Sequence, residues 1–302
     1  MSTRELTRTP HIIGLYARAA APLLPGASRL PWVGGGGGEV PDLELSLACV
    51  SVDPARVAHY NRVCGFAERE SLPATYPHVL AFPLHLALMA DGRFPFGAIG
   101  LVHVSNRITQ HRPIPVGETL QLRVRPTPLE DHPRGRTFSI LSEALLGDEL
   151  VWEERSTMLH REQPSAAAPA REPSPEAPSP PFLAEWNLAG DLGRRYASVS
   201  GDRNPIHLHP LSARALGFPR AIAHGMWTKA RCLAALEPLP AAFVIDVRFR
   251  RPILLPATVR FGSAEEGDGD RFCVRDAAED TSHLVGHMHP IGHSGGEREQ
   301  AL

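Results

Sequence analysis

The stretch "YASVSGDRNPIHLHP" (residues 196–210) combines a short repeat with a concentration of polar residues. Its first six residues follow the pattern Y-x-x-V-x-G, which also occurs in "YNRVCG" (residues 60–65). Both copies precede a strongly apolar segment. We therefore searched the chain outward from this stretch for further internal similarity.

Two more pairs of segments match in the same order. "FPLHLALM" aligns with "AIAHGMWT", which places His85 opposite His224, and "RPIPVGETLQLRV" aligns with "RPILLPATVRFGS". Three collinear matches at a nearly constant offset indicate a duplicated structural unit.

Each unit is predicted to contain a loop, one helix and then several strands. In the second unit, "HGMWTKARCLAALE" has apolar residues at helical spacing and ends at Pro238. The segments "AFVIDVRFRRPIL", "TVRFGSAE", "RFCVRDAA" and "HLVGHMH" are strand candidates separated by Pro and Gly. One long helix against an antiparallel sheet is an α+β arrangement. Two such units in one chain could pair their sheets as two subunits of a dimer would.

The composition is that of an ordinary globular protein. The 302 residues are 43% hydrophobic and 21% charged, which allows two domains of normal size. A net charge of −2 argues against a nucleic-acid partner. The four scattered cysteines form no C-x-x-C pair, which favours the cytoplasm. The N-terminus does not resemble a signal peptide, and no apolar run is long enough to span a membrane.

The predicted domain boundaries follow the composition. Residues 161–181 are rich in Pro, Ala and Ser and are expected to form an extended linker. This leaves residues 1–160 as a first unit and residues 182–302 as a second. The glycine run at residues 34–38 is expected to be a flexible turn, and the tail after Pro290 is expected to fray.

Asp202 and His207 are the candidate catalytic residues. They lie five positions apart on a segment in which Pro205 and Pro210 disfavour a continuous helix, so a short loop could direct both side chains to one point. A carboxylate and an imidazole that converge on one water form a general acid/base pair. Taken alone, Asp202 in Asp-x-Asn-Pro is equally typical of a turn.

Gly225 is a candidate oxyanion donor. It stands at the expected start of the apolar helix, where free N–H groups and the helix dipole favour negative charge, and glycine allows close approach of a ligand. A backbone N–H there could stabilise charge that develops on a carbonyl oxygen. Together with an acid/base pair, this donor fits proton transfer next to a carbonyl.

The neighbouring histidines and arginines have less specific interpretations. His207 and His209 resemble a short metal pair, but no third ligand stands at a useful spacing, so no metal is expected and His209 is expected to be exposed. His224 is expected to have a structural role. Three arginines could face the phosphates of coenzyme A or an acidic carrier protein, or could protect an edge strand: Arg248, Arg250 and Arg251.

The segment "YASVSGDRNPIHLHPLSARALGFPRAIAHGM" resembles the signature of MaoC-like hotdog dehydratases, which include the (R)-specific enoyl-CoA hydratases. The rest of the chain is similar to double-hotdog members, the (3R)-hydroxyacyl-thioester dehydratases of actinobacterial type. The resemblance therefore implies a double hotdog, with two antiparallel sheets that each wrap round one long helix.

The resemblance also implies roles for particular residues. Asp202 and His207 would activate a water and exchange its elements with C3 and C2 of a trans-2-enoyl thioester. The Gly225 N–H would hold the thioester carbonyl, and Asn204 would shape the loop. In some hydratases a helix serine supports the aspartate; by spacing that position here is Leu233, so this support is absent or supplied differently.

The first copy lacks the motif, because Phe66 follows Gly65 where an acid would be needed and Leu86 follows His85 in place of glycine. We therefore expect one active site per chain, with the first unit forming a wall of the acyl pocket.

The expected activity is that of a lyase on coenzyme A or carrier-protein thioesters in fatty-acid metabolism, without a cofactor, in a monomer or homodimer. The alternatives are a hotdog thioesterase and a non-catalytic acyl-thioester-binding partner subunit.

Overall fold

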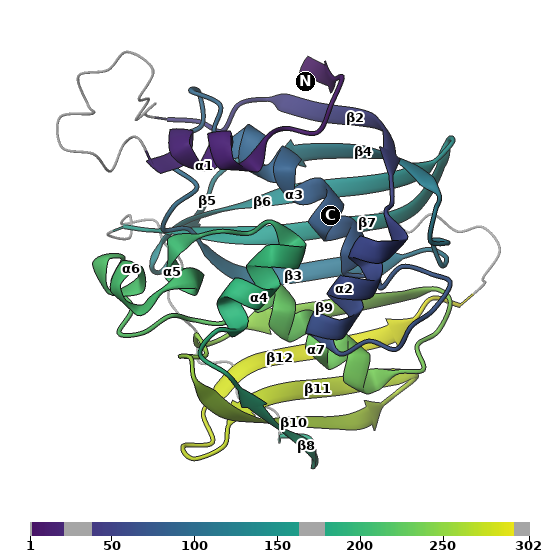
Figure 1. Ribbon diagram of the computed structural model, residues 1–302, viewed down its shortest axis with the longest axis vertical. Coiled ribbons are helices and arrows are strands. Elements are labelled where there is room, and N and C mark those ends of the chain that lie inside the picture. Colours follow the sequence, from purple (N-terminus) through teal and green to yellow (C-terminus); the bar gives the residue numbers. More distant parts are fainter. Residues whose placement is uncertain (1, 21–37, 163–178, 293–302) are drawn as a thin grey trace.

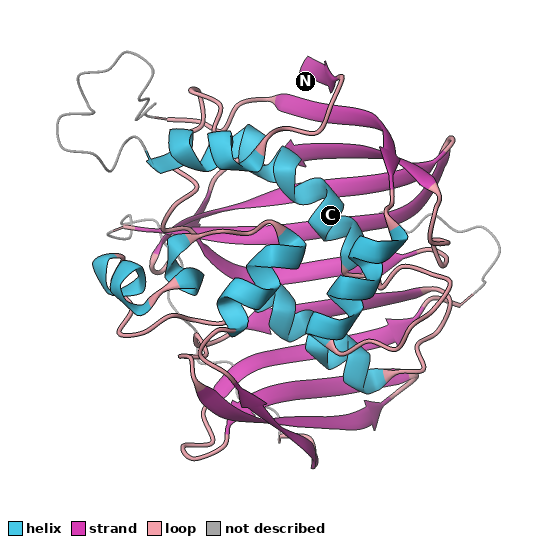
Figure 2. Cartoon of the chain, in the orientation of Figure 1, coloured by secondary structure: helices cyan, strands magenta, loops and turns pink. Residues whose placement is uncertain are grey.

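The computed structural model describes residues 2–20, 38–162 and 179–292. The strands in these residues form one 12-stranded sheet, and the helices gather on one face of it (Figures 1 and 2). The α+β prediction is confirmed, and each unit wraps its part of the sheet round a central helix as a hotdog does.

The first unit contains most of the sheet's longer strands. In chain order its elements are β1 (Ser2–Leu6), α1 (Ile12–Ala20), β2 (Leu43–Ser51), α2 (Pro54–Cys64), α3 (Tyr76–Met89), β3 (Val102–Gln110), β4 (Thr119–Pro126), β5 (Glu130–His132), β6 (Gly135–Leu146) and β7 (Glu149–Arg161).

The second unit repeats this plan with shorter strands. Its elements are β8 (Phe182–Leu188), α4 (Leu192–Ser200), α5 (Pro205–Leu208), α6 (Pro210–Ala215), α7 (Gly225–Leu236), β9 (Phe243–Phe249), β10 (Ala257–Glu266), β11 (Gly269–Asp276) and β12 (Ser282–Pro290). The four strands predicted after the helix of this unit are all present.

The two units share a continuous sheet. Its order is β1-β2-β4-β6-β7-β3-β9-β12-β11-β10-β8, with β5 beside β6, so the units join where β3 runs antiparallel to β9. In this junction Ile108 stands opposite Ile245, and both are fully buried. The predicted pairing of the two sheets is therefore made by main-chain hydrogen bonds within one chain.

The Y-x-x-V-x-G repeat encodes the C-terminal end of a helix in each unit. Gly65 ends α2 and Gly201 ends α4, both in the left-handed conformation (φ 85° and 77°), where a glycine avoids the strain that a side chain would cause. Tyr60 and Tyr196 lie one turn earlier, are buried, and contact each other with ring centroids 6.2 Å apart. The repeat thus places the two units about a common aromatic contact.

The proposed pairing of His85 with His224 is wrong. His224 is the N-cap of α7, whereas His85 lies in the second half of α3. The Leu72 N–H donates to the Ile114 oxygen just as the Ala223 N–H donates to the Ile253 oxygen, so Pro73, the residue after Leu72, is the counterpart of His224 by position. The helices differ in length, 14 residues against 12, and a match of short motifs could not detect the shift. Ala74, rather than Leu86, then stands where Gly225 stands in the second unit.

More of the chain is helical than the sequence analysis expected. The presumed loop that precedes the central helix of each unit contains α2 or α4, and the segment after Gly201 forms the short helices α5 and α6. Asn204 begins α5 by accepting a hydrogen bond from the Ile206 N–H, and His209 begins α6 in the same way through Leu211. The prolines therefore start short helices here, because proline is well tolerated at the first helical position.

Lys229 fastens α7 to the junction between the units. It is the only lysine in the chain, and its side chain is fully buried. Its ammonium group donates to the main-chain oxygens of Asn106 on β3 (3.1 Å) and Ile245 on β9 (3.2 Å), and to the Asn106 side chain. Burial lowers the pKa of Lys229 to about 7, because it removes the ammonium group from water. The three acceptors replace much of the hydration that the group loses.

Some expectations fall largely outside the described residues. These are the linker at residues 161–181, described only at its ends, the glycine run at residues 34–38, described only at Gly38, and the tail beyond residue 292. Within the described residues, no helix is long and apolar enough to cross a membrane.

Candidate active site

Asp202 occupies the turn directly after α4. Its Oδ1 accepts hydrogen bonds from the hydroxyl of Tyr16 (2.8 Å) and from the backbone N–H of Asn204 (3.0 Å). The side chain retains 26% exposure and lines the main pocket. Because Oδ1 already accepts two hydrogen bonds, Oδ2 is the oxygen with room for a ligand.

His207 lies on α5 and is buried beside Asp202. Its Nδ1 lies 2.8 Å from the carbonyl oxygen of Ile222. A carbonyl can only accept, so Nδ1 carries the hydrogen and the neutral ring keeps its lone pair on Nε2. Asp202 and His207 therefore both present acceptor atoms, as a water-activating pair requires.

His224 supports both of these residues. Its ring stacks on that of His207 with centroids 3.7 Å apart, and its Nε2 donates to the backbone oxygen of Asp202 (3.1 Å). Burial, together with the neighbouring His207, lowers the pKa of His224 to about 3, so the ring is neutral at pH 7. The expected structural role of His224 is therefore to position Asp202 and His207.

The pKa values of the pair favour the forms needed for base catalysis. Burial alone would raise the pKa of Asp202, but the nearby His224 and His207 and the Tyr16 hydrogen bond outweigh it, and the pKa lies below its ordinary value. Burial lowers the pKa of His207, and Asp202 offsets only part of that effect. At neutral pH the site thus holds a carboxylate beside a neutral imidazole.

Gly225 is the first residue of α7, with His224 as the N-cap. The N–H groups of the first turn have no acceptor inside the helix, so the Gly225 N–H can face the pocket. A Cβ atom at this position would lie 3.0 Å from the ring of Phe249. Glycine therefore allows the helix to begin directly against this aromatic wall.

Tyr16 is a site residue that the sequence analysis missed. It lies on α1, 186 positions before Asp202, and its hydroxyl accepts from the Arg203 N–H (3.0 Å) while it donates to Asp202. Burial and the Asp202 charge raise the pKa of Tyr16, which keeps it a donor. Tyr16 supplies the support that Leu233 cannot give. The apolar spacing around "HIIGLYARA" is the only sequence signal for it.

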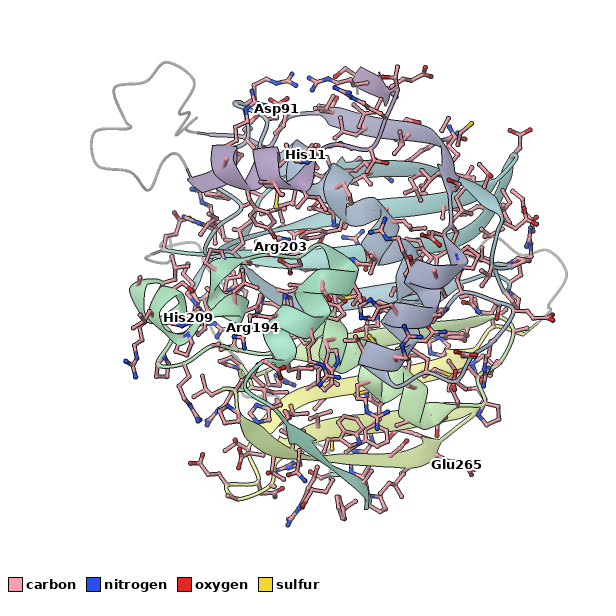
Figure 3. All side chains as sticks on the ribbon, viewed as in Figure 1. His11, Asp91, Arg194, Arg203, His209 and Glu265 are labelled. Carbon is pink, nitrogen blue, oxygen red and sulfur yellow. The ribbon has the colours of Figure 1, made fainter. Side chains whose placement is uncertain are left out.

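The pocket is built from both units. The first unit contributes Tyr16, Phe82, Leu86, Met89, His103 and Met158, and the second contributes Asp202, His207, Ile222, Gly225, Phe249 and Ile253. The expectation that the first unit forms one wall of the pocket agrees with this lining. The other expected member of the histidine pair, His209, is exposed beyond α5 (Figure 3).

The arginines after β9 lie at the pocket. Arg250 and Arg251 are exposed and line it, as does Arg161 from the first unit. The edge-strand interpretation is wrong, because β9 pairs with β3 on one side and β12 on the other and so is central to the sheet. The sequence could not reveal this, since the pairing joins the two units.

A ligand atom from each of Asp202, His207 and His224 lies within 4.8 Å of the others. Nδ1 of His207 and Nε2 of His224 are both engaged by backbone carbonyls. Oδ2 of Asp202, Nε2 of His207 and the buried Nδ1 of His224 are left without a hydrogen bond among the described residues, and all three residues line the pocket. The assignment of Asp202, His207, Gly225 and Asn204 to their roles stays a prediction.

The fold and this geometry define a hotdog protein whose pocket, shared by the two units, contains the carboxylate and imidazole of Asp202 and His207. A family model described as MaoC like domain matches residues 178–286. The 3-hydroxyacyl-thioester dehydratase X of Mycobacterium tuberculosis is 37% identical over 270 residues, 89% of this chain and 94% of that protein. The chain belongs to the MaoC-like dehydratase family.

Solved structures agree with this assignment. A crystal structure of HtdX from Mycobacterium tuberculosis has 36% identity and a TM-score of 0.74, over 82% of this chain and all of that one. A MaoC-like dehydratase from Phytophthora capsici has 20% identity and a TM-score of 0.69, over 84% of this chain and 97% of that one. The second likeness concerns the fold alone.

Proposed function

We propose that this protein catalyses the reversible (R)-specific hydration of trans-2-enoyl thioesters, or the dehydration of (3R)-3-hydroxyacyl thioesters, in fatty-acid metabolism. The observation that carries this proposal is the convergence of two acceptors, on Asp202 and His207, beside the Gly225 N–H in one pocket. The names of the relatives, a 3-hydroxyacyl-thioester dehydratase and the enoyl-CoA hydratase ChsH3, support it.

The first step is the capture of a water. Oδ2 of Asp202 and Nε2 of His207 each accept one of its hydrogens, so a lone pair of the water oxygen points away from both side chains. Tyr16 and the Asn204 N–H hold the other carboxylate oxygen and prevent the group from rotating. The water is thereby oriented before the substrate enters.

In hydration, the water oxygen bonds to C3 while one of its protons passes to the acceptor pair. Electron density moves to the thioester carbonyl oxygen, and the Gly225 N–H stabilises this enolate. The proton then passes from the pair to C2, which completes the addition of water. The steps in reverse give dehydration. C3 gains a hydroxyl group and C2 gains a hydrogen, so the substrate as a whole is neither oxidised nor reduced, and the chemistry needs no redox cofactor.

The acyl group is carried as a thioester on the phosphopantetheine of coenzyme A or of an acyl carrier protein. Arg161, Arg250 and Arg251 line the pocket and are exposed, so they offer fork-shaped donors for phosphate groups.

The four cysteines are free thiols, which supports a cytoplasmic location. Since one chain already supplies two hotdog units, a monomer is sufficient for activity, and a homodimer would be an addition.

The thioesterase alternative lacks an acid on the central helix. Helix α7 contains no Asp or Glu, and Glu237 follows its last residue. The binding-subunit alternative would leave the oriented acceptors of Asp202 and His207 without a use. Neither alternative accounts for the Tyr16 hydrogen bond to Asp202.

The test is the loss of ultraviolet absorbance of the enoyl thioester with crotonyl-CoA and dodecenoyl-CoA. We expect hydration by the wild type and a fall of at least about 10²-fold in kcat/KM for Asp202→Asn and for His207→Gln. His209→Gln is the matched control, because His209 is an exposed histidine two residues from His207. It should retain activity.

Two results would contradict the proposal. If the folded wild type is inert on both thioesters and on their carrier-protein forms, the lyase assignment is wrong. If both variants retain wild-type rates, the reaction occurs through other residues. Release of free coenzyme A instead of hydration would favour the thioesterase.

A further inference from the structure

Part of the pocket lining is polar, although an acyl chain is apolar. Three histidines of the first unit line it: His78, His85 and His103. The His103 ring contacts Phe249 (centroids 4.9 Å apart), and Phe249 also packs against Gly225. His103 therefore lies one aromatic ring away from the proposed oxyanion donor, in the direction of the first unit.

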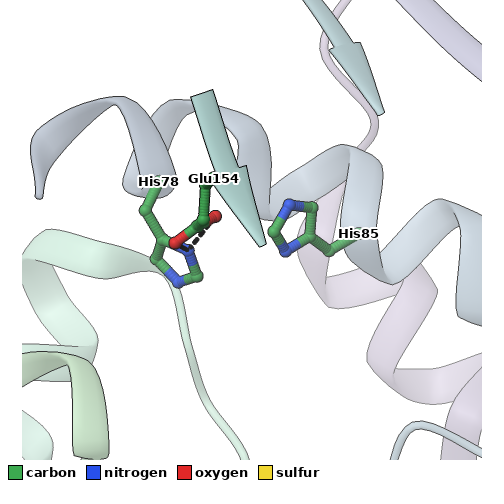
Figure 4. A group of neighbouring side chains, drawn as sticks. All are labelled: His78, His85 and Glu154. Carbon is green, nitrogen blue, oxygen red and sulfur yellow. Dashed lines mark hydrogen bonds and ion pairs between the residues drawn. The ribbon is translucent and has the colours of Figure 1, made fainter. Parts of the chain in front are cut away.

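A buried carboxylate fixes the first of these rings. Glu154 on β7 is 3% exposed, and its Oε2 accepts from Nδ1 of His78 on α3 (2.9 Å; Figure 4). Its Oε1 accepts from the side-chain amide of Asn106 (2.6 Å). Because Nδ1 bonds to this carboxylate, Nε2 is the other hydrogen-bonding atom of the His78 ring, and among the described residues it has no hydrogen-bond partner.

His103 is the residue that this network does not explain. Its Nε2 is buried and, within the described part of the chain, has no hydrogen-bond partner. A buried polar atom left unpaired is destabilising, because it loses its hydration and gains no partner in exchange. A phenylalanine or leucine would avoid that cost if the pocket accepted only hydrocarbon. Nε2 of His103 therefore indicates that a polar group of a ligand reaches this depth.

A bound cation is a poorer explanation for these side chains. His78, His85 and Glu154 offer atoms within 4.8 Å of one another. However, Nδ1 of His78 is bonded to Glu154, and Nε2 of His85 is bonded to the hydroxyl of Ser142 (2.7 Å). His103 is not a member of this group, so a metal there would leave its unpaired nitrogen unexplained.

The charges at this end of the pocket select a neutral group. Burial lowers the pKa values of His85 and His103 to about 3, so both rings are uncharged at pH 7. The neighbouring His78 and His85 lower the pKa of Glu154 to about 2 against the effect of its burial, so Glu154 is ionised. A carboxylate on the ligand would be repelled by Glu154. A hydroxyl or a ketone would not.

We propose that His78, His85 and His103 form a polar subsite that selects acyl chains carrying an uncharged oxygen substituent, a hydroxyl or a ketone. This inference rests on the proposed function, because the subsite recognises the tail of the same thioester. Nε2 of His103 and Nε2 of His78 are the atoms that would bond the substituent.

The experiment compares pairs of trans-2-enoyl-CoA substrates of equal length, from six to fourteen carbons, with either a terminal hydroxyl or a terminal methyl group. We expect one chain length at which the hydroxylated member has a kcat/KM higher by about tenfold or more, since a hydrogen-bonding site discriminates strongly against an analogue that lacks its partner. A terminal carboxylate at that length should be a poorer substrate than the hydroxyl.

The variant is His103→Phe, which should bring the ratio between the hydroxylated and plain substrates to one or below. His59→Phe, the same substitution at an exposed histidine that does not line the pocket, is the matched control and should leave that ratio as it is in the wild type. If His103→Phe does not fold, inhibition of the wild type by saturated acyl-CoA pairs, with and without the hydroxyl, gives the same comparison.

The subsite is disproved if plain chains are preferred at every length. It is also disproved if His103→Phe leaves the ratio unchanged. Both outcomes are compatible with hydration of crotonyl-CoA, which tests the proposed function separately. Conversely, if crotonyl-CoA is not hydrated, binding of the saturated pairs still reports on the subsite.

Discussion

The two oxygens of the Asp202 carboxylate have different surroundings, and this difference determines which of them can accept a hydrogen bond from a ligand. One oxygen is held by Tyr16 and the Asn204 N–H, and the other is left for a water. The hydroxyl of Tyr16 in turn accepts from the Arg203 N–H, so the tyrosine connects α1 to the turn that holds the aspartate.

Replacing Tyr16 with phenylalanine should reduce kcat by about tenfold or more, because a hydrogen bond to a charged group contributes about 1.5–3 kcal/mol. The loss of this bond should also raise the pKa of Asp202, since Tyr16 helps to lower it. The measurement is the pH profile of kcat/KM, whose acid limb reports the coupled protonation of Asp202 and His207 and should therefore move to higher pH. Tyr60→Phe, which removes a hydroxyl bonded to Thr75, should leave the profile unchanged. If the acid limb of kcat/KM does not move in Tyr16→Phe, Tyr16 stabilises the fold and does not affect the protonation of the site.

The protonation state of His207 should set a low acid limit for hydration. Burial lowers the pKa of its ring, so the neutral form persists below the usual histidine pKa of about 6.5. We expect kcat/KM for hydration to stay constant from pH 8 to below pH 6.5 and to fall only under more acid conditions. A limb at or above pH 7, measured with crotonyl-CoA, would show that His207 is not the neutral acceptor described above.

Single residues of the site differ in how well the sequence revealed them. Asp202, His207 and Gly225 were found because they stand within one short segment of recognisable chemistry. Tyr16 was not, because its contact joins positions 186 residues apart, and a tyrosine on an apolar helix has no distinctive pattern. The polar lining from His78 and His103 was missed for the same reason: burial inside the pocket depends on the pairing of β3 with β9.

Helix α1 covers the active-site turn through a close contact with Gly201. A Cβ atom on Gly201 would lie 2.6 Å from Cδ1 of Ile12 on α1. The contact places Ile12 and Tyr16, one turn apart on the same helix, over the end of α4. A side chain at Gly201 would therefore press on the end of the Ile12 side chain, through which α1 rests on this turn.

This contact can be separated from backbone strain with two alanine substitutions. Gly201 and Gly217 both have a left-handed conformation (φ 77° and 87°), so each change to alanine should cost about 1 kcal/mol of stability. Only Gly201→Ala should also displace α1 and reduce hydration, because no atom lies within 4 Å of a Cβ placed on Gly217. Denaturant unfolding and crotonyl-CoA kinetics give the two readouts. Equal activity in both variants would mean that α1 does not support Asp202.

Secondary structure was predicted well where the pattern was regular and poorly where helices were short. The four strands after α7 were expected because apolar residues, Pro and Gly mark them clearly. Helices α2 and α4 were read as loops, since their Ser, Asn and Gly residues are typical of turns, although Tyr60 and Tyr196 are buried on them. Burial of these faces against the other unit outweighs the local preference.

Acid should unfold the whole molecule through its buried neutral histidines. The pKa values of His85, His103 and His224 are lowered to about 3, mainly by burial, whereas in the unfolded chain these rings titrate near 6.5. Between these values the unfolded state binds more protons. Stability is therefore fully present above pH 6.5 and is lost as the pH falls toward 3, by about 1.4 kcal/mol per pH unit for each proton.

The measurement is urea unfolding at a series of pH values from 7.5 to 4.5. We plot the unfolding free energy against pH and divide its slope by 2.303RT, which gives the number of protons taken up on unfolding. We expect this number to approach about three near pH 5. His85→Gln should reduce that slope by about one proton, whatever its effect on the absolute stability. The exposed His209→Gln should leave the slope unchanged, because His209 is not one of these buried rings. A wild-type slope below one proton would contradict the buried neutral state of these rings.

The junction of β3 with β9 has a consequence for how the protein can change over time. In a dimer of two identical hotdog units, every mutation appears on both sides of the interface, so one surface must serve catalysis and tail binding at once. Here the same sheet is encoded as two different sequences. A mutation at His103 alters only the substrate-tail side, and a mutation at Asp202 alters only the reactive side. Selection can therefore adjust the choice of substrate without disturbing the chemistry.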